Sequence, residues 1–196
     1  MKRIFDLVIS TLLLILLSPL LLVLSMLVLL FNGSPVLFTQ LRPGYRGKIF
    51  SIYKFRTMAQ AKNTDGADLP DSVRITPFGN FLRKYSLDEL PELLNIFFGQ
   101  MSFVGPRPLL VQYLSRYNAE QNRRHDVLPG LTGWAQINGR NAISWDEKFK
   151  LDVWYVDHVS FILDVKIILM TLKNVIQRKD ISATNHATME AFKGSN

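Results

Sequence analysis

Two adjacent carboxylates, Asp88 and Glu89, have arginines within reach on both sides of the chain, Arg83 upstream and Arg107 downstream. Carboxylates can hold a divalent cation, and guanidinium groups bind phosphate oxygens, so this combination suits chemistry on a phosphorylated substrate. The same residues also admit a simpler interpretation. Ser86 and Glu89 have the spacing of a helix capping box, and acidic residues favour helix N-termini because of the helix dipole alone. The local pattern leaves both interpretations open.

The helix that carries this pair is expected to begin close to it, because Pro91 is tolerated in a first helical turn but costs about 3 kcal/mol in a helix interior. Glu89, Glu92 and Asn95 fall outside the apolar stripe that follows, and Gly99 is the expected end of the helix. The stripe has helical spacing and consists of Leu90, Leu93, Leu94, Phe97 and Phe98.

Arg107 and two cations earlier in the chain are candidates for binding phosphate. In Gly105-Pro106-Arg107-Pro108 each proline holds the preceding residue extended, so Arg107 is fixed and suits a phosphate or a carboxylate. A rigid linker that carries a surface arginine is the alternative. Lys54 and Arg56 flank Phe55 with both side chains on one side of an expected strand. Phosphate binding competes there with attachment to anionic lipid.

A glycine-rich stretch from Leu128 to Asn141 is too rich in glycine for a helix, and its backbone donors together with Arg140 could hold a diphosphate. It contains neither a Walker motif nor a dinucleotide fingerprint, which disfavours ATP-dependent and Rossmann enzymes. The chain has no cysteine, and His125 has no histidine partner at ligand spacing, so His125 is expected at the surface or behind the residues of a site. A net charge of +7 indicates an anionic partner: nucleic acid, a lipid surface or a phosphorylated substrate.

The N-terminus predicts a membrane segment, because Leu7 to Phe31 carries no charge and is long enough to match a hydrocarbon core of about 30 Å. Ser18-Pro19 stands at its midpoint, where proline removes a hydrogen bond and bends the helix. Basic residues flank both ends, which favours a re-entrant helix with both ends in the cytoplasm. They are Lys2 and Arg3 before the segment and Arg42, Arg46, Lys48, Lys54 and Arg56 after it. A proline-containing spanning helix is the alternative.

The remaining elements are expected to surround these groups. Two short strands, 36–40 and 48–55, should form a hairpin at the membrane surface. Helices are expected over 109–122, 143–159 and 161–178, the last with an apolar face of Val165, Ile168, Leu169, Leu172 and Ile176. A polar loop, 59–72, and a loose tail, 179–196, should complete the chain.

Four segments together identify a resemblance to a known family. They are Tyr53-Lys54-Phe55-Arg56-Thr57-Met58, Ser86-Leu87-Asp88-Glu89-Leu90-Pro91, Met101-Ser102-Phe103-Val104-Gly105-Pro106-Arg107-Pro108 and Thr132-Gly133-Trp134-Ala135-Gln136-Ile137-Asn138-Gly139-Arg140-Asn141. With the Ser-Pro-broken helix, their order and spacing resemble the small monotopic phosphoglycosyl transferases of the bacterial sugar-transferase family, of the PglC type. Leu128 departs from this pattern, which usually has arginine before Pro129-Gly130, and the departure puts one substrate contact in doubt.

The resemblance implies a mainly α fold with a small β-hairpin, in a monotopic membrane protein with surface amphipathic helices. Residues 1–31 would form the re-entrant helix and residues 32–196 a catalytic domain facing the cytoplasm at the bacterial inner membrane. The implied reaction moves a sugar phosphate from a UDP-sugar to polyprenyl (undecaprenyl) phosphate and releases UMP, with downstream glycosyltransferases as further partners. Nucleic acid is not an expected partner.

The same resemblance assigns roles to residues. Asp88 would be the nucleophile and a ligand of Mg²⁺, with Glu89 beside it. Cationic arginines, Mg²⁺ and a helix N-terminus are expected to hold Asp88 ionised. Arg83, Arg107 and Arg140 would bind the phosphates and the nucleotide. Two other classes stay open at this stage: a membrane-anchored basic binding module without chemistry, and a glycosyltransferase that releases UDP.

Overall fold

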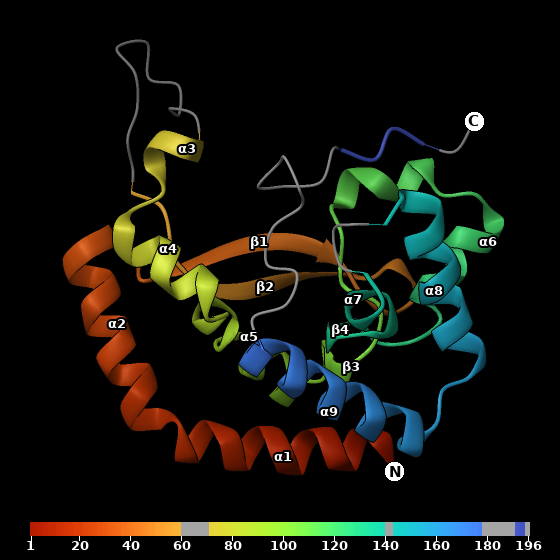
Figure 1. Cartoon of the computed structure of the whole chain (residues 1–196), viewed down its shortest axis with the longest axis horizontal. Helices are drawn as coiled ribbons and strands as arrows, with labels where there is room; N and C mark the ends of the chain where they lie inside the picture. Colours follow the sequence, from red (N-terminus) through yellow and green to blue (C-terminus); the bar gives the residue numbers. More distant parts are fainter. Residues whose placement is uncertain (60–70, 140–142, 178–190, 195–196) are drawn as a thin grey trace.

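The structure is a computed structural model that describes residues 1–59, 71–139, 143–177 and 191–194 (Figure 1). Within these ranges the chain is mainly helical, with two two-stranded sheets. Most of the polar loop predicted over 59–72 lies outside the described residues. The helices are α1 (Lys2–Leu16), α2 (Ser18–Asn32), α3 (Asp71–Arg74), α4 (Pro77–Lys84), α5 (Glu92–Phe97), α6 (Ala119–Asn122), α7 (Trp134–Ile137), α8 (Trp145–Asp157) and α9 (Phe161–Gln177). The strands are β1 (Leu37–Pro43), β2 (Ile49–Phe55), β3 (Ser102–Val104) and β4 (Gly130–Thr132).

The apolar N-terminal segment is broken where the sequence predicted. Leu17 separates α1 from α2, and the two helices meet at a bend of 64° (Figure 1). The Ser18 hydroxyl donates to the carbonyl oxygen of Ile15 at 2.8 Å, and Pro19 lies in the first turn of α2. No single helix in the described ranges is long and apolar enough to cross a membrane, although α1 and α2 together meet that criterion as a bent pair.

The first turn of α1 is fixed to the rest of the chain by its basic residues. Lys2 forms an ion pair with Asp164 of α9. Arg3 donates to the carbonyl oxygens of Ile96 and Phe97 at 2.6 and 2.7 Å, where α5 ends and its carbonyls lack helical partners. These two cations, expected only as flanks of a membrane segment, therefore hold α1 to α5 and α9.

The last turn of α2 is also fixed to the rest of the chain, at Arg56 and Thr76. Asn32 is buried, donates to the carbonyl oxygen of Arg56 at 2.5 Å and accepts a hydrogen bond from the Thr76 hydroxyl at 2.6 Å. Between these anchored ends the outer faces of the bent pair are exposed and apolar: Ile4, Val8, Leu12, Ile15, Leu16, Leu22, Val23, Met26, Leu29, Leu30 and Phe31.

The predicted hairpin is confirmed. Strands β1 and β2 are antiparallel, with Leu37 opposite Phe55 and Pro43 opposite Ile49. One face of the hairpin packs on α5 and joins a core of Phe50, Ile52, Leu93, Ile96 and Met101. This contact brings the strand that carries Lys54 against the helix that follows the acidic pair.

The glycine-rich stretch contributes one strand, β4, which pairs in parallel with β3 in a second sheet. The short helix α7 follows, so the expectation that the stretch forms no helix is wrong at Trp134–Ile137. Gly105 N donates to Thr132 O at 2.9 Å, and Gly130 N donates to Pro106 O at 3.1 Å. A Cβ added at Gly130 would lie 2.1 Å from Gly105 N, and one added at Gly133 would lie 2.2 Å from Gly105 O. Glycine is needed here for close backbone packing, and the amide of Gly130 is not available to a diphosphate as the sequence interpretation supposed.

Helices α8 and α9 confirm two predicted helices, and the predicted apolar face of α9 is only partly packed against the protein. Asp164 and Ile167 are buried, whereas Leu169 and Leu172 are 61% and 55% exposed. The reason is that the Asp164 carboxylate is neutralised inside the fold by Lys2 and also accepts from the Tyr155 hydroxyl at 2.6 Å. A charged residue can therefore point inward while leucines point outward.

The single helix predicted over 109–122 is wrong. The chain forms a 3₁₀ helix over Val111–Arg116 and then starts again at α6. Asn118 explains the break, because its side chain accepts from Gln121 N and the Gln121 side chain accepts from Asn118 N. This capping box starts a new helix inside the predicted one.

Two side chains are buried, one predicted at the surface or behind a site and the other predicted in a loose tail. His125 is 6% exposed, and its burial, together with the charge of Arg124, lowers its pKa to about 4. Phe192, in the tail predicted to be loose, is 3% exposed and packs among aromatic rings. The tail prediction is therefore wrong at Phe192, while residues 178–190 lie outside the described part of the chain.

Candidate active site

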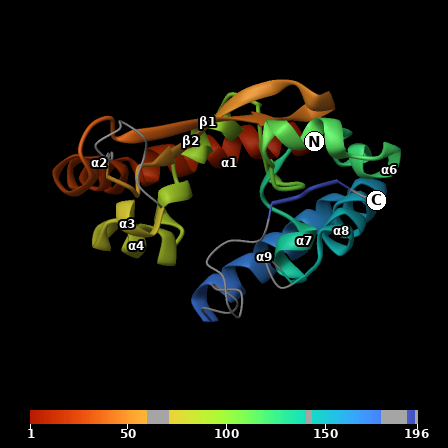
Figure 2. The ribbon, with the colours of Figure 1, turned by 90° about the horizontal axis from the view of Figure 1, so that it is seen from above.

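A cleft of about 1490 Å³ contains the acidic pair. Seen from above, α9 diverges from α1 (Figure 2), and both helices contribute to the cleft wall. The polar side of the cleft is lined by Lys54, Arg83, Asp88, Glu89 and Arg107. Its apolar side is lined by Phe5, Ile9, Leu13 and Leu17 of α1 with Ile168 and Leu172 of α9. One cavity thus offers cations and carboxylates beside a hydrocarbon-like surface.

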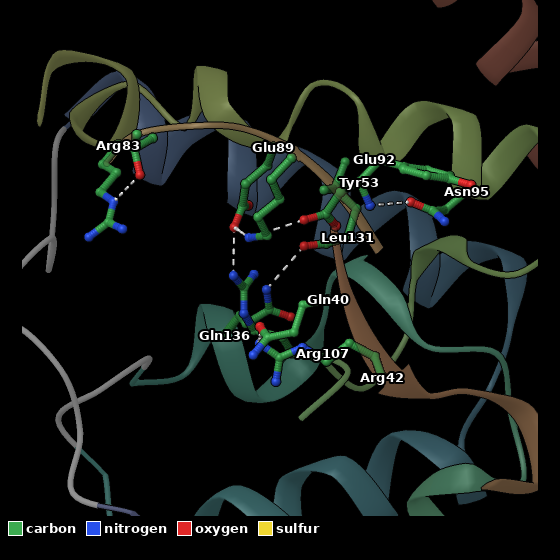
Figure 3. Close-up of polar contacts among 12 residues, drawn as sticks. Gln40, Arg42, Tyr53, Arg83, Glu89, Glu92, Asn95, Arg107, Leu131 and Gln136 are labelled. Atoms are coloured by element: carbon green, nitrogen blue, oxygen red, sulfur yellow. Dashed lines mark hydrogen bonds and ion pairs between the residues drawn. The ribbon is translucent and has the colours of Figure 1, made fainter. Parts of the chain in front are cut away.

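Glu89 is held by two cations. Its Oε1 accepts from Lys54 Nζ at 2.6 Å and from Arg107 Nη2 at 2.5 Å (Figure 3). Although burial alone would raise the pKa of Glu89, the charges of Arg107 and Lys54 hold it well below its usual range. Glu89 is therefore a carboxylate with a fixed position and a fixed negative charge.

Asp88 lines the same cleft, but its bonding and electrostatic surroundings differ from those of Glu89. Within the described ranges its carboxylate forms no hydrogen bond or ion pair. Burial and then the charge of Glu89 raise the pKa of Asp88, against the opposing effects of Lys54, Arg83 and Arg107. The sequence predicted that arginines, Mg²⁺ and a helix N-terminus would hold Asp88 ionised. The direction of the pKa shift differs because burial, together with the charge of Glu89, outweighs the nearby cations.

The chain around the pair is not the continuous helix that was predicted. Leu87–Glu89 forms a 3₁₀ turn, and α5 begins only at Glu92. Ser86 precedes the turn in a left-handed conformation, with φ of 54°, and its side chain makes no capping bond. The capping-box interpretation is therefore wrong, and the turn presents both acids beside β2 and Arg107. Gly99, with φ of 76°, follows the end of α5 as predicted.

Glu92 and Asn95 are buried, although the sequence placed them outside the apolar stripe. Asn95 accepts from Tyr53 N at 3.0 Å (Figure 3) and donates to Ser51 O at 2.7 Å, so it bonds to the backbone of β2. Glu92 Oε1 lies 3.1 Å from Lys54 Nζ without hydrogen-bond geometry. Burial and then the charge of Glu89 raise the pKa of Glu92 to about 7.

Glu92 is therefore a site residue that sequence reasoning missed. It lies three positions after Glu89, the spacing at which side chains share a helix face, and that spacing was the available signal. Lys54 lies between the two glutamates, and this contact adds a third acid to the two that were predicted.

Arg107 is positioned by its flanking prolines, as predicted, and also by a buried ion pair. Arg124 donates to the carbonyl oxygen of Arg107 at 2.7 Å, and its Nε and Nη2 reach Asp152 Oδ2 at 3.1 and 2.8 Å. Both members of the pair are at most 3% exposed. Arg124 and Asp152 were not identified from the sequence, because a basic run at a helix end normally lies in solvent.

The other predicted cations lie farther from Glu89 or outside the described residues. Arg83 Nε donates to the Thr57 hydroxyl at 2.9 Å, away from the glutamate cluster (Figure 3). Arg56 lines the cleft, and its Nη1 donates to the carbonyl oxygen of Ser34. Arg140 lies outside the described residues. Arg42, which sequence reasoning assigned only to the basic flank, also lines the cleft.

The donor set is compatible with Mg²⁺ bound together with a substrate. No group of three or more acidic or histidine side chains in the described ranges could hold a metal by itself. Mg²⁺ commonly binds through one or two carboxylates, with waters and substrate phosphates completing its shell. Asp88, in the cleft and without a cationic partner among the described residues, fits the carboxylate part of that set.

A family model describing bacterial sugar transferases matches residues 1–178. EpsL, an uncharacterized sugar transferase of Bacillus subtilis (strain 168), is 54% identical over 195 residues, which cover 100% of this chain and 96% of EpsL.

Two further relatives are larger proteins. A UDP-glucose:undecaprenyl-phosphate glucose-1-phosphate transferase of Klebsiella pneumoniae is 41% identical over 181 residues, covering 87% of this chain and 39% of that protein. An undecaprenyl-phosphate galactose phosphotransferase of Salmonella typhimurium is 37% identical over 199 residues, covering 91% of this chain and 41% of that protein. The matched region therefore spans about two fifths of each of these two relatives.

Proposed function

Because the chain belongs to the bacterial sugar transferase family, we propose that it is a phosphoglycosyl transferase that moves a sugar phosphate from a UDP-sugar to polyprenyl phosphate. The names of the Klebsiella and Salmonella relatives support this reaction class. The observation that carries the proposal is the cleft, in which Asp88 and the Glu89–Arg107 pair lie beside an apolar wall from α1 and α9. A nucleotide sugar needs the polar side, and a polyprenyl chain needs the apolar side.

The chemistry we propose has two steps. A carboxylate oxygen of Asp88 bonds to the sugar-bearing phosphorus, and the bond from that phosphorus to the bridging oxygen breaks, so that UMP leaves with the electron pair. A phosphate oxygen of the polyprenyl phosphate then attacks the same phosphorus, which releases the Asp88 carboxylate. Atoms and charge balance without a general base, because both nucleophiles react as anions.

The other side chains have binding and orienting roles in this proposal. Arg107 donates one Nη to Glu89, which leaves its remaining donors for phosphate oxygens. Glu89 fixes Lys54 and Arg107, and Arg83 and Arg56 add positive charge to the same cleft. Asp88 would hold Mg²⁺ jointly with substrate phosphate oxygens, and this ion would reduce the repulsion between the carboxylate and the diphosphate.

We further propose that α1 and α2 enter the bilayer and return, so that the chain is monotopic on the cytoplasmic face of the bacterial inner membrane. The support is that both ends of the bent pair are anchored on the same domain, at Lys2–Asp164 and at Asn32–Arg56. The exposed apolar faces between these anchors suit lipid contact.

Topology can be tested directly because the chain has no native cysteine. A single cysteine would be placed in a short tag before Met1, and a second variant would carry Arg46→Cys at the exposed hairpin tip. Both should react with an impermeant maleimide only from the cytoplasmic side. Labelling of the two positions from opposite sides would show a spanning helix instead.

The reaction is tested with purified protein, polyprenyl phosphate and a panel of UDP-sugars, with the nucleotide product identified by chromatography. UMP together with a lipid-linked diphosphosugar is expected. Release of UDP would identify a conventional glycosyltransferase, and tight lipid binding without any nucleotide product would identify a binding module. The panel also identifies the sugar.

A further inference from the structure

A single side chain from the C-terminal segment fills an aromatic cage far along the chain from the acidic pair. The Phe192 ring is 3% exposed. Its centroid lies 5.7 Å from that of Tyr113, 5.9 Å from Tyr117, 5.6 Å from Trp145 and 5.0 Å from Phe149. Aromatic contacts of this kind stabilise a structure beyond the burial of apolar area.

The backbone of Phe192 is fixed as well. Its N–H donates to the Tyr113 hydroxyl at 3.2 Å, and its carbonyl oxygen accepts from Nη1 of Arg116. The neighbouring residues Ala191 and Lys193 are exposed. The segment is therefore held by one buried ring and two hydrogen bonds.

The far side of the cage supports the guanidinium of Arg124. That group lies 5.8 Å from the centroid of the Tyr117 ring and 5.7 Å from that of Phe149, within cation–π range. The same guanidinium donates to the carbonyl oxygen of Arg107 and pairs with Asp152. Phe192 thus packs directly on both rings that support the residue that holds Arg107.

We propose that Phe192 is a positioning residue and that the segment 191–194 acts as a latch that keeps Arg107 directed at Glu89. Removing the ring would leave a large void beside Tyr117 and Phe149, and interiors relax only partly around such voids. The two rings would shift toward the space, and Arg124 would lose its support on that face. Arg107 would then lose its backbone contact with Arg124, while its covalent neighbours stay unchanged.

This proposal rests on the proposed function for its kinetic test, so a second readout is independent of activity. Hydrogen exchange measured by mass spectrometry would follow the amides of residues 104–117 in the full-length protein. Phe192→Ala should speed exchange in this peptide, and Lys193→Ala, which changes an exposed side chain of the same segment, should not. Unchanged hydrogen exchange in Phe192→Ala would overturn the proposed positioning role of Phe192, even if no UDP-sugar proves to be a substrate.

In the kinetic test Phe192→Ala should lower kcat/KM about tenfold at a temperature where the variant remains folded by circular dichroism. Phe192→Leu, which keeps most of the buried volume but not the aromatic ring, should recover part of the loss and stay below the wild type, and Lys193→Ala should match the wild type. If Phe192→Ala is too unstable to assay, Phe192→Leu is compared with Lys193→Ala alone, and equal rates for those two would count against the proposal.

A double-mutant cycle with Arg107→Lys separates positioning from general destabilisation. If Phe192 acts through Arg107, the loss caused by Phe192→Ala should nearly disappear in the Arg107→Lys background. If the two losses multiply, the segment influences activity by another route and the proposed path through Arg124 is wrong.

Discussion

Nη2 of Arg107 lies 2.5 Å from Oε1 of Glu89, and this contact distinguishes the two acids of the pair. Glu89 is committed to Arg107 and Lys54, so its lone pairs are directed at cations. Asp88, one residue earlier, has no ion pair among the described residues and faces the cleft. The contact therefore explains physically why the carboxylate we propose as nucleophile is Asp88.

The same contact predicts that Arg107→Lys is strongly impaired although the charge is kept. A lysine has no planar fork, so it cannot hold Glu89 with one nitrogen and bind a phosphate oxygen with another from the same fixed backbone. Loss of one charge-assisted hydrogen bond costs about 1.5–3 kcal/mol, so kcat/KM should fall about 10- to 100-fold. Arg46→Lys, at the exposed hairpin tip, is the matched control and should keep the wild-type rate. A wild-type rate for Arg107→Lys would reduce Arg107 to a linker residue.

Glu92 predicts a pH dependence of stability. Its pKa is raised to about 7 in the folded protein by burial and by the charge of Glu89, against about 4.5 when unfolded. The folded state therefore binds more protons between these values, and this contribution to stability is lost as pH rises from about 4.5 to about 7. Glu92→Gln cannot titrate, so its free energy of unfolding should improve relative to the wild type across that range.

Urea unfolding of both proteins in the same detergent between pH 5 and 8 measures this difference. Glu120→Gln, an exposed substitution on α6, serves as the control for general effects of charge removal. A constant difference between wild type and Glu92→Gln across the range would mean that Glu92 titrates alike in the folded and unfolded states.

Local chemistry explains which parts of the fold could be read from the sequence. The break at Ser18-Pro19, the hairpin over 36–55 and the non-helical backbone at Arg107 depend on residues next to one another, and all three are confirmed. The buried Glu92 and the inward-facing Asp164 depend on partners far along the chain. Their cations, Lys54 for Glu92 and Lys2 for Asp164, lie on other elements that sequence periodicity does not place.

The residues of the candidate site also fall into those that the sequence identified and those that it did not. Asp88, Glu89, Lys54 and Arg107 share one cleft, as the sequence pattern suggested. The buried pair of Arg124 and Asp152 was invisible because each residue alone resembles an ordinary surface charge. Only the packing of α8 against the chain near Arg107 removes both from water.

Activity is expected to require Mg²⁺. The attacking carboxylate and the diphosphate are all anionic, and the lysine and arginine nearest the pair are already bonded to Glu89. Excess EDTA should abolish UMP release, and added Mg²⁺ should restore it. Calorimetric titration of UDP with and without Mg²⁺ gives a readout that does not depend on turnover. Full activity in excess EDTA would remove this prediction.

The last prediction concerns the order of the chemistry. If Asp88 attacks first, enzyme and UDP-sugar alone should release UMP, at no more than one equivalent per active site, before any polyprenyl phosphate is added. Steady-state kinetics should then be ping-pong. Mass spectrometry should find a sugar-phosphate adduct on the peptide that contains Asp88. Asp88→Asn should abolish both signals, because the neutral amide is a poor nucleophile and cannot form the acyl phosphate.

Glu89→Gln is the informative comparison, because it removes the neighbouring carboxylate and leaves Asp88 in place. Loss of that charge frees Lys54 and Arg107 and removes a repulsion from Asp88, so some adduct should still form while turnover falls. The competing mechanism is a ternary complex in which Asp88 only holds the metal and the polyprenyl phosphate attacks directly. That mechanism predicts no UMP until lipid is present. A single-turnover experiment with folded, Mg²⁺-loaded enzyme that yields no UMP without lipid would therefore reject the covalent step and leave the overall reaction intact.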